Sequence, residues 1–71
     1  MSIFTIAKKL KHLRRLVNHY RLEHKGLSYR QAKFEVLDDL FDSLPDGAYF
    51  AAMEEQGYET EDIIECSEAR K

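Results

Sequence analysis

The sequence predicts an all-α fold in which an antiparallel two-helix hairpin is covered by two short helices. Apolar residues recur every three to four positions through residues 2–24 and 28–44, which is typical of amphipathic helices. Only a short link separates these segments, as in helical hairpins. Two further short segments, 47–56 and 60–68, follow the break at Pro45 and carry helix signals of their own.

The first segment, residues 2–24, is predicted to form one helix, the longest of the chain. Ser2 is a candidate N-cap, and Gly26 stands where a left-handed residue would end the helix. An a/d seam of almost three heptads runs along it, formed by Ile3, Ile6, Leu10, Leu13, Val17 and Tyr20.

The second segment, residues 28–44, is expected to be the helix around which the chain is organised. Ser28 followed by Gln31 fits a capping box, and Pro45 should stop the helix at the residue before it. Its seam consists of Phe34, Leu37, Phe41 and Leu44.

Antiparallel packing of these two helices predicts four layers. The pairs are Tyr20 with Phe34, Val17 with Leu37, Leu13 with Phe41, and Leu10 with Leu44. The same register brings Arg14 level with Asp38 on one flank of the hairpin.

The two short helices are predicted to begin after Asp46 and at the cap Thr60, and the tail 67–71 is expected to fray. The first turn of the chain, with Ile3 and Ile6, overhangs the second helix. Either the two short helices or a second copy of the chain must cover it, and the second option would make the protein a homodimer.

Length and composition indicate a single small domain, residues 1–71, in the cytoplasm. The chain has 71 residues and no apolar run near the ~20 residues that a membrane span needs. Cys66 is the only cysteine, which excludes an internal disulfide and fits a reducing compartment.

The charge is unevenly distributed along the chain. Residues 1–25 carry seven Lys/Arg and one acid, a net charge of +6, whereas residues 26–71 carry four Lys/Arg and twelve acids, a net charge of −8. The overall net charge of −2 therefore conceals a dipolar molecule.

The sequence gives little reason to expect catalysis, a metal or a cofactor. It has no glycine-rich phosphate loop and no nucleophile elbow. Glu65 and Glu68 flank Cys66 and should raise the pKa of its thiol, which is the reverse of activation. His12 and His19 share a helix face but lie two turns apart, roughly 10 Å, which is too far to bind one ion.

We therefore expect a non-catalytic protein-binding regulator, an adaptor or inhibitor that acts through charged helix faces. The candidate partner-binding residues are Glu35, Asp38, Asp39, Asp42, Lys8, Lys11, Arg15 and Leu22. Nucleic-acid binding by the basic face of the first helix ranks second. It requires Lys8, Lys11, Arg15 and Arg21 to remain free instead of pairing with acids.

Overall fold

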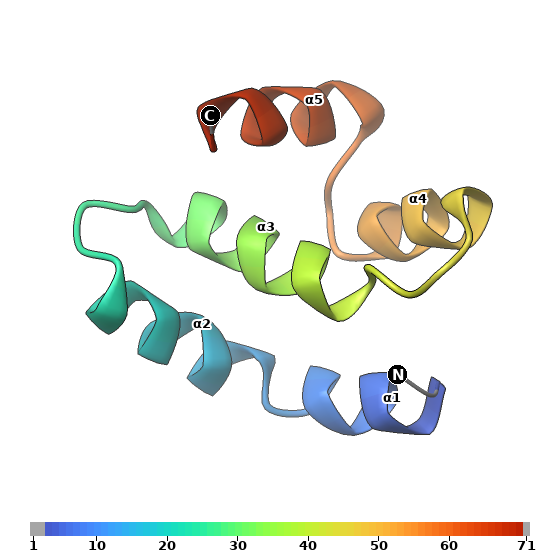
Figure 1. The fold of residues 1–71 in the computed structure, drawn as a ribbon, viewed down its shortest axis with the longest axis horizontal. Coiled ribbons are helices and arrows are strands. Elements are labelled where there is room, and N and C mark those ends of the chain that lie inside the picture. Colours follow the sequence, from blue (N-terminus) through green and yellow to red (C-terminus); the bar gives the residue numbers. More distant parts are fainter. Residues whose placement is uncertain (1–2, 71) are drawn as a thin grey trace.

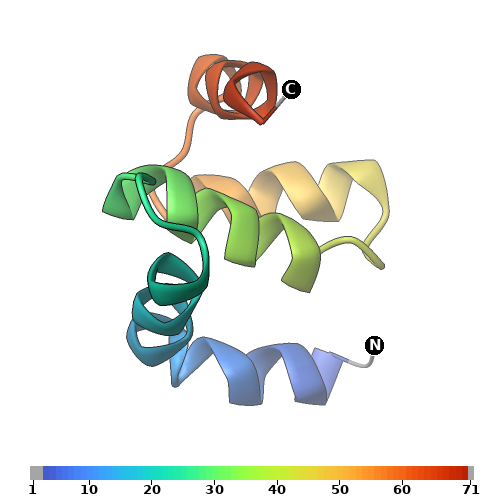
Figure 2. The same ribbon diagram turned by 60° about the vertical axis from the view of Figure 1, so that its left-hand side comes forward.

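The computed structural model describes residues 3–70, which form five α-helices and no strand (Figure 1). The helices are α1 (Ile3–Leu10), α2 (Leu13–Glu23), α3 (Tyr29–Leu40), α4 (Asp46–Glu55) and α5 (Thr60–Ala69). The all-α class and the predicted hairpin are confirmed, since α2 packs along α3. Figures 1 and 2 show α3 in the middle, with α2 on one side of it and α5 on the other.

The single helix predicted over residues 2–24 is wrong, because the chain breaks at Lys11 and His12. The amide of His12 donates to the carbonyl of Lys9, three residues back, and the α-helical ladder resumes only from the carbonyl of His12. The bend redirects α1, so that Ile6 enters the core instead of overhanging α3. Burial of this side chain offsets the lost helical bonds. The predicted cap Ser2 lies outside the described residues.

The connection between α2 and α3 follows the expected signals. Gly26 has φ +96°, a left-handed conformation that glycine adopts without a steric penalty. Ser28 then caps α3, its hydroxyl accepting from the amide of Gln31 at 3.1 Å. The Gln31 side chain does not complete the predicted box. It donates instead to the carbonyl of Cys66 on α5, at 3.1 Å.

The remaining boundaries differ from the prediction by up to one turn. Helix α3 ends at Leu40 instead of Leu44, because a turn over residues 41–43 leads the chain toward α4. Helix α5 is capped by Glu59 and not by Thr60, in a capping box with Asp62. It continues to Ala69, so the predicted fraying of the tail does not begin at residue 67.

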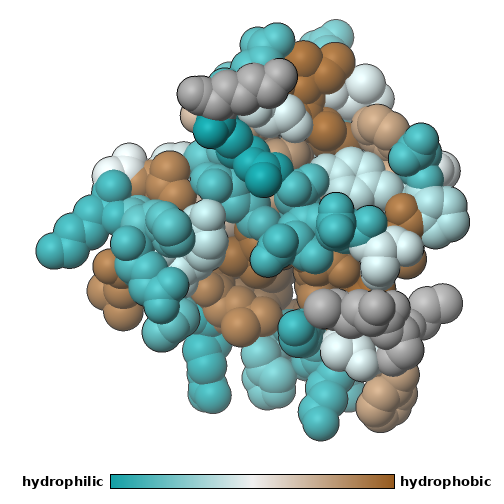
Figure 3. Space-filling view, viewed as in Figure 1, coloured by the Kyte–Doolittle hydropathy of each residue, from teal (hydrophilic) through white to brown (hydrophobic). Residues whose placement is uncertain are grey.

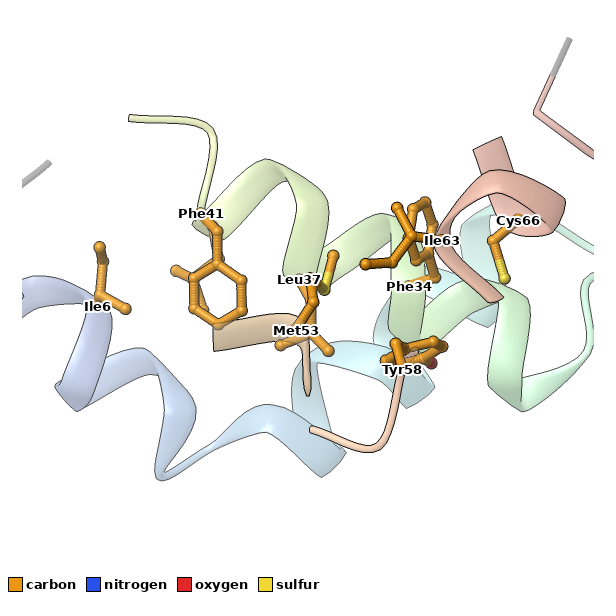
Figure 4. Packing of buried hydrophobic residues seen from close by; sticks show 9 residues of the cluster. Ile6, Phe34, Leu37, Phe41, Met53, Tyr58, Ile63 and Cys66 are labelled. Carbon is orange, nitrogen blue, oxygen red and sulfur yellow. The ribbon is translucent and has the colours of Figure 1, made fainter. Parts of the chain in front are cut away.

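The core is one elongated cluster along α3 (Figure 4). Ile6 and Phe41 lie at one end of the cluster, and Cys66 lies at the other. All helices except α2 contribute buried members, namely Ile6, Phe34, Leu37, Leu40, Phe41, Met53, Tyr58, Ile63 and Cys66. Ile6 is thus covered by other parts of the same chain. This agrees with the first of the two alternatives above, in which the short helices cover it. The side chain of Ile3 lies outside the described part.

Helix α2 is attached to α3 through its inner side. Val17 is fully buried, and Leu13 packs against the core cluster. The Tyr20 hydroxyl donates to the Glu35 carboxylate at 2.9 Å. These contacts agree with the predicted hairpin, and they turn the opposite side of α2 toward solvent.

Polar contacts also join α3 to the C-terminal half of the chain. Tyr58 donates from its hydroxyl to the carbonyl of Arg30 at 2.8 Å. Tyr49 donates to the Asp38 carboxylate at 2.6 Å, and Arg70 forms an ion pair with the same carboxylate. Tyr49, Tyr58 and Arg70 of the C-terminal half are therefore engaged with α3.

Candidate functional site

The most strongly charged surface is the solvent-facing side of α2, here called the α2 outer face. It lies opposite Val17, which is buried against α3. Its members follow one another at steps of three and four residues or sit beside that stripe, and all are exposed: Lys11, Arg14, Arg15, Asn18, Arg21, Leu22 and Lys25. Five of them belong to α2, whereas Lys11 lies in the bend before the helix and Lys25 in the turn after it; all seven line two hollows that share Asn18 and Leu22.

The cations of the α2 outer face have no acidic partner within residues 3–70. The Arg21 side chain donates to the backbone carbonyl of Leu27 at 3.4 Å, and the side chains of the other four, Lys11, Arg14, Arg15 and Lys25, form no hydrogen bond or ion pair there. The internal contacts of the fold therefore do not account for these charges.

Leu22 stands in the middle of this basic surface. Its side chain is 75% exposed, which is unusual among the large apolar residues of the chain. It lines two adjoining hollows together with Asn18, one lined further by Arg14 and Arg15 and the other by Arg21 and Lys25. No carboxylate among residues 3–70 lines either hollow. Figure 3 shows isolated apolar side chains standing among hydrophilic ones on the side of the molecule where α2 lies.

The acids predicted to form a partner-binding row on α3 are separated by their contacts. Glu35 accepts hydrogen bonds from Tyr20 and from Gln31, and Asp38 accepts from Tyr49 and Arg70. Asp39 is exposed beside a groove between α2 and α3, and Asp42 is exposed in the turn after α3. Glu35 and Asp38 thus form hydrogen bonds within the fold. The four acids therefore do not form one continuous unpaired acidic face.

The basic residues predicted to bind a partner all remain exposed. The structure brings Lys11, Arg15 and Leu22 together in one hollow. Lys8 is exposed on α1, beyond the bend at residues 11–12, and lines neither hollow. The predicted proximity of Arg14 to Asp38 is wrong, because Asp38 pairs with Arg70 while Arg14 faces the solvent side of α2.

Arg14, Asn18 and Lys25 belong to the α2 outer face as well, and they were not among the eight candidate partner-binding residues. The signal was present, since they continue the helical spacing of Lys11, Arg15 and Leu22. Their assignment depends on which side of α2 meets α3. The burial of Val17 and the hydrogen bond from Tyr20 to Glu35 identify the side of α2 that packs against α3.

A third hollow, of about 250 Å³, lies between α2 and α3. Its apolar floor is formed by Leu16, Val36 and Leu40, and Glu35 and Asp39 stand at its sides. The exposed pair His19–Glu23, with 3.1 Å between ring nitrogen and carboxylate, is at its edge. Within residues 3–70 no three His, Cys, Asp or Glu side chains gather as metal ligands.

Two titratable groups packed in or against the core, Cys66 and Tyr49, have raised pKa values. Burial raises the pKa of the Cys66 thiol, and the Glu65 charge adds to this, as the sequence indicated, although Arg30 opposes it. Burial and the hydrogen bond to Asp38 raise the pKa of Tyr49 as well. A raised thiol pKa leaves less of the reactive thiolate at neutral pH.

Comparison of the sequence with protein-family models and with curated proteins, and of the fold with solved structures, gave no match. Within residues 3–70, no helix has both the length and the apolar character to cross a bilayer. A functional proposal therefore depends on the geometry of the described surface.

Proposed function

We propose that the chain is a non-catalytic protein-binding module, an adaptor or inhibitor, that docks its α2 outer face on an acidic surface of another protein. The observation that carries this proposal is the set of four unpaired cations around the exposed Leu22. The chain has 13 acidic residues, yet none pairs with these four within residues 3–70. Acids on a partner would supply the missing counter-charges.

Leu22 is the residue that favours a protein over a nucleic acid. Protein interfaces combine an apolar centre with a polar or charged rim, and the α2 outer face has this layout. Full burial of a leucine side chain is worth about 1.5–3 kcal/mol. A phosphate backbone offers no apolar surface for Leu22, so this contribution would be lost there.

Nucleic-acid binding is the second candidate, and one observation favours it. Lys8, Lys11 and Arg15 are unpaired within residues 3–70, and Arg21 is bonded only to a carbonyl, which is the condition that this function requires. Four phosphate contacts would make affinity fall about a hundredfold between roughly 50 and 200 mM salt. The net charge of −8 on residues 26–71 opposes the approach of a phosphate backbone, as it opposes that of an acidic protein surface, so the choice between the two depends on Leu22.

The test is affinity capture from the native host at about 0.15 M salt. A variant carrying Lys11→Glu and Arg15→Glu should lose the protein that the parent chain captures, because repulsion replaces attraction at the centre of the face. The matched control is Lys8→Glu with Lys9→Glu on α1, which changes the net charge equally and should retain the captured protein.

Two results would contradict the proposal. Equal loss in both variants would mean that only net charge matters. Release of the captured material by nuclease, but not by a buffer of the same salt concentration, would mean that the chain binds nucleic acid and not a protein.

A further inference from the structure

Helix α5 carries a surface that is the charge complement of the α2 outer face. Its exposed residues Ile64, Glu65 and Glu68 lie together, joined by Glu61 one turn earlier. Ile64 is 54% exposed, and the three glutamates form no ion pair within residues 3–70. We call these four residues the α5 outer face.

The two faces match in composition as well as in sign. Each has one large, branched apolar side chain, Leu22 or Ile64, with exposed charges of one sign near it. The acid of α5 that points inward, Asp62, is already paired with Arg30. On α5, the exposed glutamates therefore remain available as counter-charges for cations of another molecule.

The two faces of one copy cannot meet each other. Helix α2 buries Val17 against one side of α3, whereas α5 buries Ile63 and Cys66 toward the other side. Figures 1 and 2 show α2 and α5 separated by α3. Contact between the complementary faces is therefore available only between different copies of the chain.

We propose that copies of this chain associate head to tail, with the α2 outer face of one copy on the α5 outer face of the next. Leu22 then meets Ile64 at the centre, and the cations meet the glutamates around it. The contact joins two different surfaces, so it builds a ring if the rotation between copies closes and an open filament if it does not.

This inference deepens the proposed function, since it names a competitor for the same α2 face. A copy whose α2 is covered by a neighbour cannot dock on an acidic partner. Self-association would thus withhold the face at high protein concentration and release it on dilution. The charges lie at the surface, so salt should dissolve the assembly as the Debye length falls from about 30 Å at 0.01 M to about 8 Å at 0.15 M.

Charge exchange between the two faces tests the inference by sedimentation velocity over a range of protein concentrations. The parent chain at 10 mM salt should sediment faster as its concentration rises, and should be monomeric at 500 mM salt. Lys11→Glu with Arg15→Glu, and separately Glu65→Lys with Glu68→Lys, should each remain monomeric. An equal mixture of the two variants should associate again, because each acidic or basic face regains an opposite one.

The control for net charge is Glu54→Lys with Glu55→Lys, both exposed at the end of α4, and it should behave as the parent chain. Circular dichroism shows whether each variant folds. If a lysine variant fails to fold, Glu65→Gln with Glu68→Gln replaces it and is expected to be monomeric.

A parent chain that is monomeric at 10 mM salt, or a mixture of the two variants that stays monomeric, would overturn the inference. The glutamine variant also separates it from the proposed function. That variant should lose self-association and still capture the partner protein through α2. If the parent chain self-associates but captures no partner protein, the proposed function is contradicted and the head-to-tail contact is supported.

Discussion

Phe34→Ala should lower the free energy of unfolding by about 3–5 kcal/mol, the largest effect expected of any single substitution in this chain. Phe34 is fully buried in the core cluster and meets the Tyr58 ring edge-on, with 5.7 Å between ring centroids. Its removal leaves a cavity between α3 and α5. A domain of this size has about 4–11 kcal/mol of total stability, so the variant should be close to unfolded.

Urea denaturation monitored by circular dichroism measures this effect. The matched control is Phe4→Ala, because Phe4 is 78% exposed and the same atoms are removed. The control should change stability by no more than about 0.5 kcal/mol. Equal losses in the two variants would mean that the core is not centred on α3.

The second large effect is a loss of stability in alkali. Burial raises the pKa of Tyr58 to about 12 from an ordinary value of 10.0, and its hydroxyl donates to the Arg30 carbonyl. A pKa raised by folding means that the fold favours the protonated phenol. The stabilisation is complete below pH 10 and is lost as the pH rises toward 12, a loss of about 2–3 kcal/mol. Tyr49, whose pKa is also raised, should add to the loss.

Urea denaturation repeated between pH 7 and pH 12 provides the test, with tyrosinate absorbance followed in parallel. Tyr58→Phe should weaken the fold somewhat at pH 7, where it loses one hydrogen bond, and should reduce the alkaline loss. Tyr29→Phe is the control, since the Tyr29 side chain is 39% exposed. A Tyr58→Phe protein with the parent's full alkaline loss would contradict the assignment to Tyr58.

The hairpin was predictable because its signals are local. The link with Gly26, the cap at Ser28 and the apolar spacing of α2 and α3 each act over a few residues, and they agree with one another. Gly57, shortly after α4, likewise adopts a positive φ of +92°. The bend at residues 11–12 carries no such signal. It depends on the placement of Ile6 in a core assembled from α3, α4 and α5.

The candidate site was only partly predictable for the same reason. Lys11, Arg15 and Leu22 could be grouped from their spacing along one helix. The fate of the α3 acids could not, because Asp38 is engaged by Tyr49 and Arg70, the latter 32 residues away in sequence. The arrangement of α4 and α5 on α3 determines which acids are left for a partner.

The central claim is that Leu22 and the cations around it contact another protein. A photocrosslinking amino acid at position 22, compared in living cells with the same amino acid at the equally exposed position 4, tests this most directly. We predict an adduct from position 22 that protease removes and nuclease does not, and that Lys11→Glu with Arg15→Glu abolishes. An adduct joined to residues of α5 would identify the second copy of this chain. Equal adducts from positions 22 and 4, or a nuclease-sensitive adduct from position 22, would contradict the claim.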